Sequence, residues 1–305
     1  MSHDLNFLSQ EQRMIRDMAK DFARNELAPF ASSWDQGETF PDSIYRRMGE
    51  LGLMGMTVSE KWGGSEADTV SYAIALEEIA AGDVGTSTAM SVNNSLVCSG
   101  LEEFGSEQQK SKILKPLAKG EALGCFCLTE PHAGSDASAI KSKAYMDGNE
   151  WVINGTKQFI TSGSKADYAI VFAVTDPEAG KKGLSCFIVP TNTNGYKVSR
   201  LEKKMGQRAH DTAQLIFEDL RLPPEQILGK QGEGYKIALS NLEGGRIGVA
   251  SQALGAARAA YEHALEYAKQ RVTFGKPIIE HQAVGFRLAD MATEIDAARM
   301  LAWRA

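Results

Sequence analysis

The segment from Phe126 to Asp136, FCLTEPHAGSD, contains the residue types best suited to binding a ligand. A strand is expected to end at Thr129, and a loop of small residues follows it. Gly134 lets a ligand approach the main chain closely, Ser135 supplies a hydroxyl group, and the loop amides can point at an anionic group. The same residues can also form an ordinary turn between two strands. The segment is therefore a candidate binding loop that needs support from neighbouring elements.

Other cofactor and catalytic motifs are missing from the sequence. No Gly-x-Gly-x-x-Gly follows a predicted strand, and no Gly-x-x-x-x-Gly-Lys-Ser/Thr is present. We find no nucleophile elbow. The five histidines do not form a metal-ligand cluster. His210 and Asp211 could be a catalytic pair, but we favour a surface turn at this position.

The cysteines are expected to be reduced and buried. The spacing Cys125-x-Cys127 is not that of a zinc knuckle, and no second pair accompanies it. Positions two apart on a strand face the same side of a sheet. We therefore predict that these two thiols lie together in the core.

The composition excludes several classes of function. The 305 residues carry a formal net charge of −6, which disfavours a nucleic-acid partner. No stretch reaches the length of a membrane span, and the start, MSHDLNFLSQ, is neither a secretory signal nor an Arg-rich transit peptide. We expect a cytoplasmic protein, or a mitochondrial matrix protein if a targeting segment has been removed.

Helical patterns dominate the first 121 residues. Ser9 and Gln12 form a capping box before apolar residues at helical spacing, and Ser106 and Gln109 form another. Asp68 caps a helix between them. These residues predict an all-α N-terminal domain at 1–121.

Residues 122–233 change to strands and turns. They are about one hundred residues of expected antiparallel structure, the size of a small barrel or sandwich. Asp147-Gly148 and Asn154-Gly155 are hairpin signals because both dipeptides tolerate positive φ. A short strand is expected between them at 150–153. Further strands are predicted at 169–174, 184–189 and 213–217.

Residues 234–305 return to helix. Small residues between Gly255 and Ala260 would let a neighbouring helix approach closely, and a second long helix runs from Glu280 to the end. Because the sequence ends inside this helix without a cap, we expect an incomplete, truncated helical bundle. The whole chain is predicted to be a multidomain α+β protein: helical, β-barrel or sandwich, and helical.

Several motifs along the chain support the candidate loop. CLTEPHAGSDASA begins at Cys127, KQFIT spans 157–161, and IFEDLRLP spans 216–223. GGRIGVASQALG follows at 244–255, and RVTFGK begins at Arg271, with His281-Gln282 shortly after it. In this order they resemble the acyl-CoA dehydrogenase family over the whole chain. The fourth motif resembles its short-chain, butyryl-CoA dehydrogenase-like branch.

This resemblance implies that FAD lies between the β domain and the last helical domain. The implied FAD contacts within the β domain are Phe126, Leu128, Thr129, Gly134, Ser135, Phe159, Ile160 and Thr161. Thr129 would lie near the flavin N5, and Ser135 would also touch the acyl-CoA. Ile160 can equally be explained by packing in the β core.

Further contacts are implied outside the β domain. Arg271 and Gln282 would reach the FAD of a neighbouring subunit, where a guanidinium suits a pyrophosphate. The expected assembly is a homodimer or homotetramer, although Arg271 can also be explained as a charge at a helix C-terminus. Glu243, Gly245 and Arg246 are the implied acyl-CoA contacts on the last domain. Arg246 can equally be a structural ion-pair residue.

The implied reaction is α,β-desaturation of a short-chain acyl-CoA, straight or branched. A carboxylate removes the α-proton while hydride leaves the β-carbon for the flavin. Electrons then pass to electron-transferring flavoprotein, the family's usual partner. No catalytic base is assigned within the chain, because the family's usual glutamate would lie beyond Ala305. Gly245 stands where one branch of the family carries an alternative glutamate.

Two alternatives remain open at this point. The chain could be an inactive, truncated family member that binds FAD and acyl-CoA weakly or not at all. It could also perform chemistry that needs no base, such as elimination from a β-substituted acyl-CoA.

Overall fold

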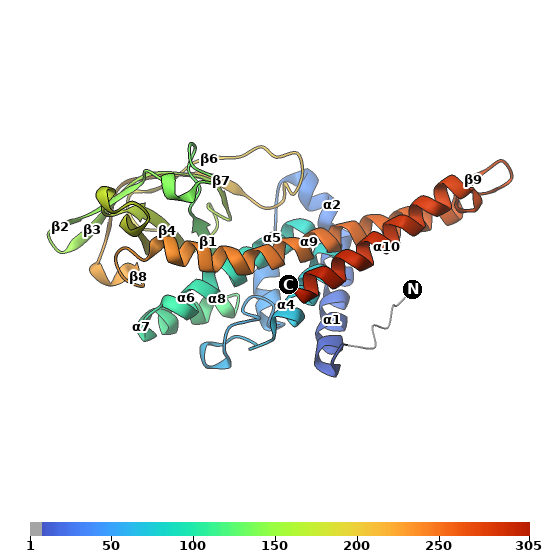
Figure 1. Cartoon of the computed structure of the whole chain (residues 1–305), viewed down its shortest axis with the longest axis horizontal. Helices are drawn as coiled ribbons and strands as arrows, with labels where there is room; N and C mark the ends of the chain where they lie inside the picture. The colour runs from blue at the N-terminus through green and yellow to red at the C-terminus, as the bar shows by residue number, and fades with distance from the viewer. Residues whose placement is uncertain (1–7) are drawn as a thin grey trace. The chain divides into compact units, whose positions relative to one another are not determined.

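A computed structural model describes residues 8–305 (Figure 1). The chain forms two compact units. The helical unit contains the residues up to Ser33, together with Thr69–Thr88 and Ile247–Ala305; the sheet unit contains Trp34–Asp68 and Ala89–Arg246. Helices α2, α5 and α9 run from one unit into the other.

The helical unit is built around one buried helix. Its elements, with the helices that enter it, are α1 (Gln10–Phe22), η1 (Ala23–Leu27), α2 (Ala28–Gly37), α4 (Thr69–Gly82), α5 (Val84–Ser91), α9 (Gly234–Gln270), β9 (Val272–Thr273), β10 (Lys276–Pro277), η8 (Ile278–Glu280) and α10 (Gln282–Arg304). The predicted capping box of Ser9 and Gln12 is confirmed. Every residue of α4 from Ser71 to Ala80 is buried, as expected of a helix that is covered on all sides.

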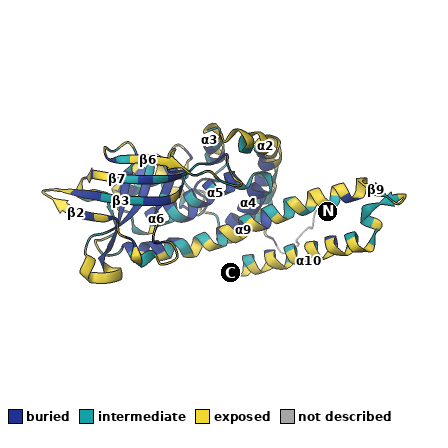
Figure 2. Ribbon diagram, turned by 90° about the horizontal axis from the view of Figure 1, so that it is seen from above, coloured by how far each residue is buried: buried dark blue, intermediate teal, exposed yellow. Residues whose placement is uncertain are grey.

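Helix α9 approaches α4 closely at the predicted small residues. A Cβ atom at Gly255 would lie 2.2 Å from the carbonyl oxygen of Glu77 in α4, so only glycine fits there. Figures 1 and 2 show α10 alongside the second half of α9, with much of its surface exposed. No helix in residues 8–305 is long and apolar enough to cross a membrane.

The sheet unit combines short helices with one large sheet. Its helical segments are α3 (Ser43–Glu50), η2 (Glu60–Trp62), η3 (Val92–Cys98), α6 (Ser99–Phe104), α7 (Glu107–Gln109), η4 (Lys110–Leu114), α8 (Lys115–Ala118), η5 (Ala137–Ala139), η6 (Pro177–Gly183) and η7 (Pro224–Gln226). Its strands are β1 (Gly124–Cys127), β2 (Lys143–Asp147), β3 (Glu150–Thr161), β4 (Tyr168–Val174), β5 (Leu184–Pro190), β6 (Tyr196–Leu201), β7 (Thr212–Leu222) and β8 (Ile227–Leu228). The capping box of Ser106 and Gln109 is confirmed.

The eight strands form a mixed sheet rather than a purely antiparallel one. The order is β6-β7-β3-β2-β4-β5-β8, and β1 pairs with β4. The β1–β4 pairing is parallel, with Cys125 opposite Ala169. Parallel pairing requires a long crossover, which residues 128–167 with β2 and β3 provide here, and the hairpin signals gave no indication of it.

One of the two predicted hairpins is wrong. Asp147-Gly148 does form a turn: Asp147 pairs with Glu150, and Gly148 has φ +63°. Asn154-Gly155, by contrast, lies inside β3 at a shift in the register with β7, so β3 runs well past the predicted strand. A Cβ atom at Gly155 would lie 2.2 Å from Ser142 Oγ, so this glycine permits a close approach rather than a turn.

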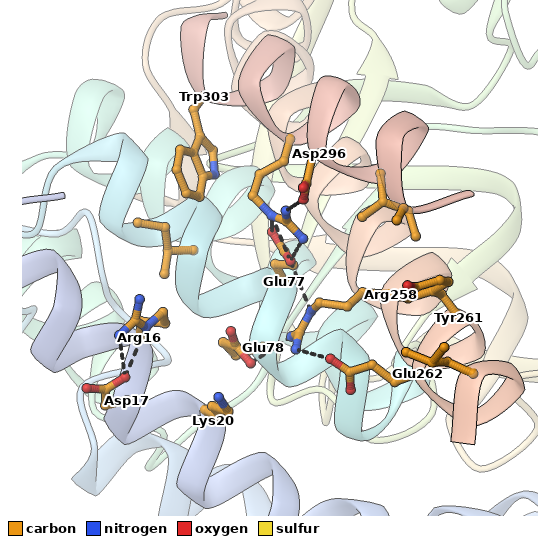
Figure 3. Close-up of a pocket in the computed structure, with 15 residues that line it drawn as sticks. Arg16, Asp17, Lys20, Glu77, Glu78, Arg258, Tyr261, Glu262, Asp296 and Trp303 are labelled. Carbon is orange, nitrogen blue, oxygen red and sulfur yellow. Dashed lines mark hydrogen bonds and ion pairs between the residues drawn. The ribbon is translucent and has the colours of Figure 1, made fainter. Parts of the chain in front are cut away.

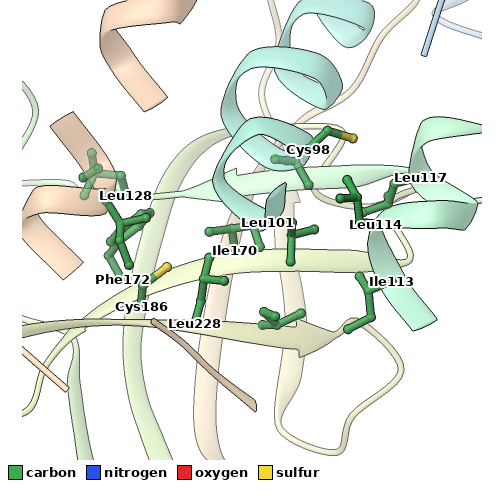
Figure 4. Close-up of a cluster of buried hydrophobic side chains, with 14 of the residues drawn as sticks. Cys98, Leu101, Ile113, Leu114, Leu117, Leu128, Ile170, Phe172, Cys186 and Leu228 are labelled. Atoms are coloured by element: carbon green, nitrogen blue, oxygen red, sulfur yellow. The ribbon is translucent and has the colours of Figure 1, made fainter. Parts of the chain in front are cut away.

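Alternate residues along the strands form two hydrophobic clusters. One contains Cys125 and Cys127, whose sulfur atoms lie 3.8 Å apart and are buried as predicted. In this cluster the Trp151 ring of β3 packs on Phe187 of β5 at 5.2 Å, so the sheet curls over its own core. The other cluster lies under the helices and is drawn in Figure 4. The predicted order of helical, β and helical regions is confirmed.

The interpretation of His210 as part of a surface turn is wrong. Its side chain is 4% exposed, and its Nδ1 atom lies 3.0 Å from Tyr45 Oη. The ring also packs on Phe40, with centroids 4.0 Å apart. Both partners are far away in the sequence, so local composition could not reveal this burial.

Candidate functional site

The loop that follows β1 is tightly closed at its start and open at its tip. Glu130 and Ala133 exchange main-chain hydrogen bonds of 2.9 and 3.1 Å. Gly134 and Ser135 are exposed, and a Cβ atom at Gly134 would meet nothing within 4 Å. The tip therefore presents main chain and a hydroxyl group to the solvent, which favours a binding loop over a packed turn.

Phe159 on β3 has an unusual conformation. Its φ is +58° and its side chain is 63% exposed. Positive φ is uncommon for a bulky residue and often accompanies a functional site. Residues two apart on a regular strand face the same side, yet Lys157 is fully buried. An irregularity in the β3–β7 register between Lys157 and Ile160 turns the Phe159 ring outward.

The loop and the Phe159 segment are joined directly. The main-chain N–H of Gln158 donates a hydrogen bond to the main-chain carbonyl oxygen of Thr129 at 2.9 Å. Lys157 Nζ donates to the Leu128 carbonyl oxygen at 3.0 Å. The structure thus brings together the two segments that carry the implied flavin contacts of the β domain.

Lys157 also forms a buried ion pair that the sequence analysis missed. Its Nζ lies 2.9 Å from Glu130 Oε1. The Glu130 carboxylate accepts further hydrogen bonds from the amides of Lys141 at 2.6 Å and Ser142 at 2.9 Å. The sequence carried only a weak signal, because Lys157 stands between the polar residues Thr156 and Gln158, and its burial is visible only in the structure.

The electrostatics of the pair favour an ionised carboxylate. Burial alone would raise the pKa of Glu130, but the Lys157 ammonium group and the donated hydrogen bonds of Ser142 and Lys141 outweigh it and hold this pKa below its usual value. Burial lowers the pKa of Lys157, and the Glu130 carboxylate opposes that shift. His132 Nε2 lies 3.5 Å from the same carboxylate, at the exposed edge.

The remaining predicted FAD contacts of the β domain differ in how far their side chains are exposed to solvent. Phe126 is half-buried and packs on Phe172, with ring centroids 5.0 Å apart. Leu128 lies in the same cluster, as Figure 4 shows, so little of its side chain remains for a ligand. Thr129 and Thr161 are half-buried. The Ile160 side chain is buried in the other cluster, which fits its interpretation as β-core packing.

The start of α9 belongs to the sheet unit and carries the predicted acyl-CoA contacts. Asn241 Nδ2 donates to the Leu96 carbonyl oxygen at 3.0 Å, and a Cβ atom at Gly245 would lie 3.1 Å from Leu96 Cδ2. Glu243 and Arg246 are exposed. Within residues 8–305, Arg246 makes no ion pair, which argues against a purely structural role.

Arg271 and Gln282 belong to the helical unit, in the connection between α9 and α10. Both are exposed. Arg271 directly follows the last residue of α9, and its amide donates to the Tyr267 carbonyl oxygen at 2.9 Å. This position agrees with a helix C-terminal charge and leaves the guanidinium group accessible.

A second cluster of charged groups lies in the helical unit, beside a cavity of about 280 Å³ (Figure 3). Arg299 donates to both carboxylate oxygens of Glu77, at 2.9 and 3.0 Å. Arg258 donates to Glu77 at 3.1 Å and to Glu78 at 2.6 Å. Because these charges satisfy one another, the arrangement is that of a structural network.

Comparison with known proteins identifies the family. Models of the acyl-CoA dehydrogenase N-terminal, middle and C-terminal domains match residues 9–121, 125–220 and 232–305. The chain belongs to the acyl-CoA dehydrogenase family. It is 47% identical to the mitochondrial short-chain specific acyl-CoA dehydrogenase of Rattus norvegicus, over 98% of this chain and 72% of that protein.

Solved structures of acyl-CoA dehydrogenases have the same fold. The butyryl-CoA dehydrogenase of Megasphaera elsdenii superposes with a TM-score of 0.95 and 42% identity, over 97% of this chain and 79% of that one. A glutaryl-CoA dehydrogenase from Mycobacterium smegmatis in complex with FADH2 superposes with a TM-score of 0.94 and 36% sequence identity, over 99% of this chain and 76% of that one. Acyl-CoA dehydrogenases are FAD-dependent oxidoreductases.

Proposed function

We propose that this chain binds FAD and a short-chain acyl-CoA and acts in α,β-desaturation of the thioester. The observation that carries the proposal is the junction between the open Gly134–Ser135 loop and the exposed Phe159. These residues fit a flavin, because an outward aromatic ring supplies an apolar face and the loop supplies unobstructed main-chain groups.

The proposed FAD contacts keep the residues implied by the sequence. They are Phe126, Leu128, Thr129, Gly134, Ser135, Phe159, Ile160 and Thr161, with Arg271 and Gln282 reaching in from a neighbouring subunit. When bound, FAD supplies the hydride acceptor for the reaction. Phe159 would cover the ring and exclude water. The hydroxyl groups of Thr129 and Ser135 would orient the polar edge of the cofactor and the thioester.

The proposed acyl-CoA contacts are Ser135, Glu243, Gly245 and Arg246. Arg246 is an exposed cation without an ion-pair partner in the described part of the chain, which suits an anionic portion of CoA. We assign the catalytic base to no residue of this chain. Gly245 lies against Leu96 and has no side chain to offer.

We further propose electron-transferring flavoprotein as the electron acceptor and a homodimer or homotetramer as the assembly. The exposed side chains of Arg271 and Gln282 support contacts to a second copy. Arg271→Gln is expected to weaken FAD binding only under conditions in which the chain self-associates. Flavin fluorescence across a dilution series measures this, and a concentration-independent effect would argue against contacts in trans.

Anaerobic addition of butyryl-CoA to the FAD-loaded chain tests the proposal. We expect retained flavin whose absorbance is perturbed by butyryl-CoA. Bleaching in addition would show that a base for the α-proton is present in residues 1–305 or in a partner. A series of longer and branched acyl chains tests the short-chain preference. If flavin is retained but no acyl-CoA alters its spectrum, the acyl-CoA assignment is wrong. If no flavin is retained, the FAD site is wrong for this chain.

Ser135→Ala is the first variant to compare, with Ser164→Ala as its control. Both serines are exposed in the sheet unit, but Ser164 lies outside the proposed site. Ser135→Ala should reduce the spectral response to butyryl-CoA, and Ser164→Ala should leave it unchanged. Equal responses in the two variants would remove Ser135 from the site.

A further inference from the structure

Glu130 and Lys157 form an ion pair at a site that is closed to solvent. The Lys157 side chain is 0% exposed and the Glu130 side chain is 2% exposed. Lysine and glutamate are almost never fully buried unless they are paired. The pair lies outside the set of proposed ligand contacts, so binding chemistry alone does not explain it.

The contacts of the pair reach both ends of the candidate loop. Glu130 starts the loop, and its carboxylate accepts hydrogen bonds from the amides of Lys141 and Ser142, where the loop returns to β2. One carboxylate therefore closes the loop that carries Gly134 and Ser135. Lys157 Nζ also donates a hydrogen bond to the carbonyl oxygen of Leu128, the residue before Thr129.

The same pair connects that loop to the irregular part of β3. Thr129 immediately precedes Glu130, and Phe159 lies two residues after Lys157, beyond the point where the register shifts. The Gln158–Thr129 main-chain hydrogen bond lies between them. Thr129 lies one residue from Glu130 and Phe159 lies two residues from Lys157, so the ion pair joins the two segments close to both of these residues.

We propose that Glu130 and Lys157 are positioning residues that hold the loop and the outward Phe159 ring in the relative position needed to bind FAD. This inference rests on the proposed function. It explains why an ion pair is present at a buried site where apolar residues would serve stability equally well. A buried ion pair often contributes little net stability compared with apolar residues of similar volume. The backbone groups that this pair holds cannot be held by an apolar side chain.

The test compares Lys157→Met and Glu130→Gln with the unaltered chain. FAD affinity is measured by flavin fluorescence, and the exchange of the amide hydrogens of residues 130–141 is measured without FAD. Each substitution should weaken FAD binding by roughly 10- to 100-fold, the range seen when a residue that orients a metal ligand is removed. Amide exchange in the loop should accelerate in both variants.

Ile153→Ala is the matched control. Ile153 is fully buried on the same strand, four residues before Lys157, and its side chain packs in the hydrophobic cluster that contains Cys125 and Cys127. It should lower thermal stability while FAD affinity and loop exchange stay the same in the folded protein. If Ile153→Ala and Lys157→Met weaken FAD binding equally, the pair is only structural and the inference is overturned.

The two exchange outcomes separate this inference from the proposed function. In one outcome the unaltered chain binds no FAD, while the loop amides still exchange faster in the variants. That result would support the positioning role and refute the FAD site. Unchanged loop exchange together with unchanged FAD affinity would refute the positioning role. Should Lys157→Met fail to fold, Glu130→Gln, which keeps the side-chain shape, carries the same test.

Discussion

The two units of the molecule bury their charges in different ways. In the sheet unit, Glu130 binds one ammonium group and two main-chain amides beside an open loop. In the helical unit, the Glu77 carboxylate binds the guanidinium groups of Arg258 and Arg299, which come from two other helices and are its ion-pair partners within residues 8–305 (Figure 3). Main-chain partners fix the path of a loop, and side-chain partners fix the packing of helices. We expect the first arrangement to govern binding and the second to govern stability.

The largest expected effect is the loss of Glu77. Glu77→Ala would leave Arg258 and Arg299 without their shared carboxylate in a buried site. Breaking a buried ion pair on one side costs about 3–5 kcal/mol of unfolding free energy. Urea denaturation measures it. A loss below about 1 kcal/mol would show that other carboxylates, such as Glu78, replace Glu77. It would contradict the expectation that the charge network of the helical unit governs stability.

The second effect compares two glycines of α9, one in each unit. Gly255→Ala would place Cβ 2.2 Å from the Glu77 carbonyl oxygen, which belongs to rigid backbone. The expected loss is about 1–3 kcal/mol, as for other overpacked sites. Gly245→Ala would place Cβ 3.1 Å from the end of the Leu96 side chain, which can move. There the higher helix propensity of alanine, about 1 kcal/mol, offsets the contact. Thermal unfolding of both variants should therefore show a shift only for Gly255→Ala.

The third effect should separate binding from stability. Phe159→Ala removes an exposed side chain, so the unfolding free energy should change by no more than about 0.5 kcal/mol. FAD affinity should fall by up to about 10-fold, because an aromatic contact contributes about 0.5–1.5 kcal/mol. Flavin fluorescence titration beside urea denaturation measures both. A loss of stability without a loss of affinity would exclude Phe159 from the flavin site.

The smallest effect is a difference in pH dependence between the two units. The Glu130 pKa is lowered, so its stabilising contribution is present above the unfolded value of about 4.3 and is lost as the pH falls through the folded pKa. Burial raises the pKa of Glu78 despite the opposing charge of Arg258. Its contribution is fully present below about pH 4.3 and is lost as the pH rises through its folded pKa.

Denaturation of Glu130→Gln and Glu78→Gln across acidic pH measures this difference. Relative to the unaltered chain, the Glu130→Gln variant should lose less stability below about pH 4.3. Relative to the unaltered chain, the Glu78→Gln variant should lose more stability as the pH falls toward that value, because it lacks the carboxyl group whose protonation favours the folded state. Parallel curves for all three proteins would contradict both assignments.

Local signals predicted much of the fold. The capping boxes at Ser9 and Ser106 and the turn at Asp147-Gly148 were predicted correctly, because each depends on residues only a few positions apart. Asn154-Gly155 has the same local chemistry as Asp147-Gly148. Its outcome differed because Ser142, a residue outside the dipeptide's neighbourhood, packs against Gly155.

The sequence alone determined the family, the order of helical and β regions, and the two segments that carry the candidate flavin contacts. These features depend on residue types at short spacing, which the chain displays directly. The tertiary structure alone decided that His210 is buried, that β1 pairs with β4 in parallel, and that Lys157 is joined to Glu130. Each of these depends on groups distant along the chain, whose desolvation must be compensated by a partner that only folding brings within reach.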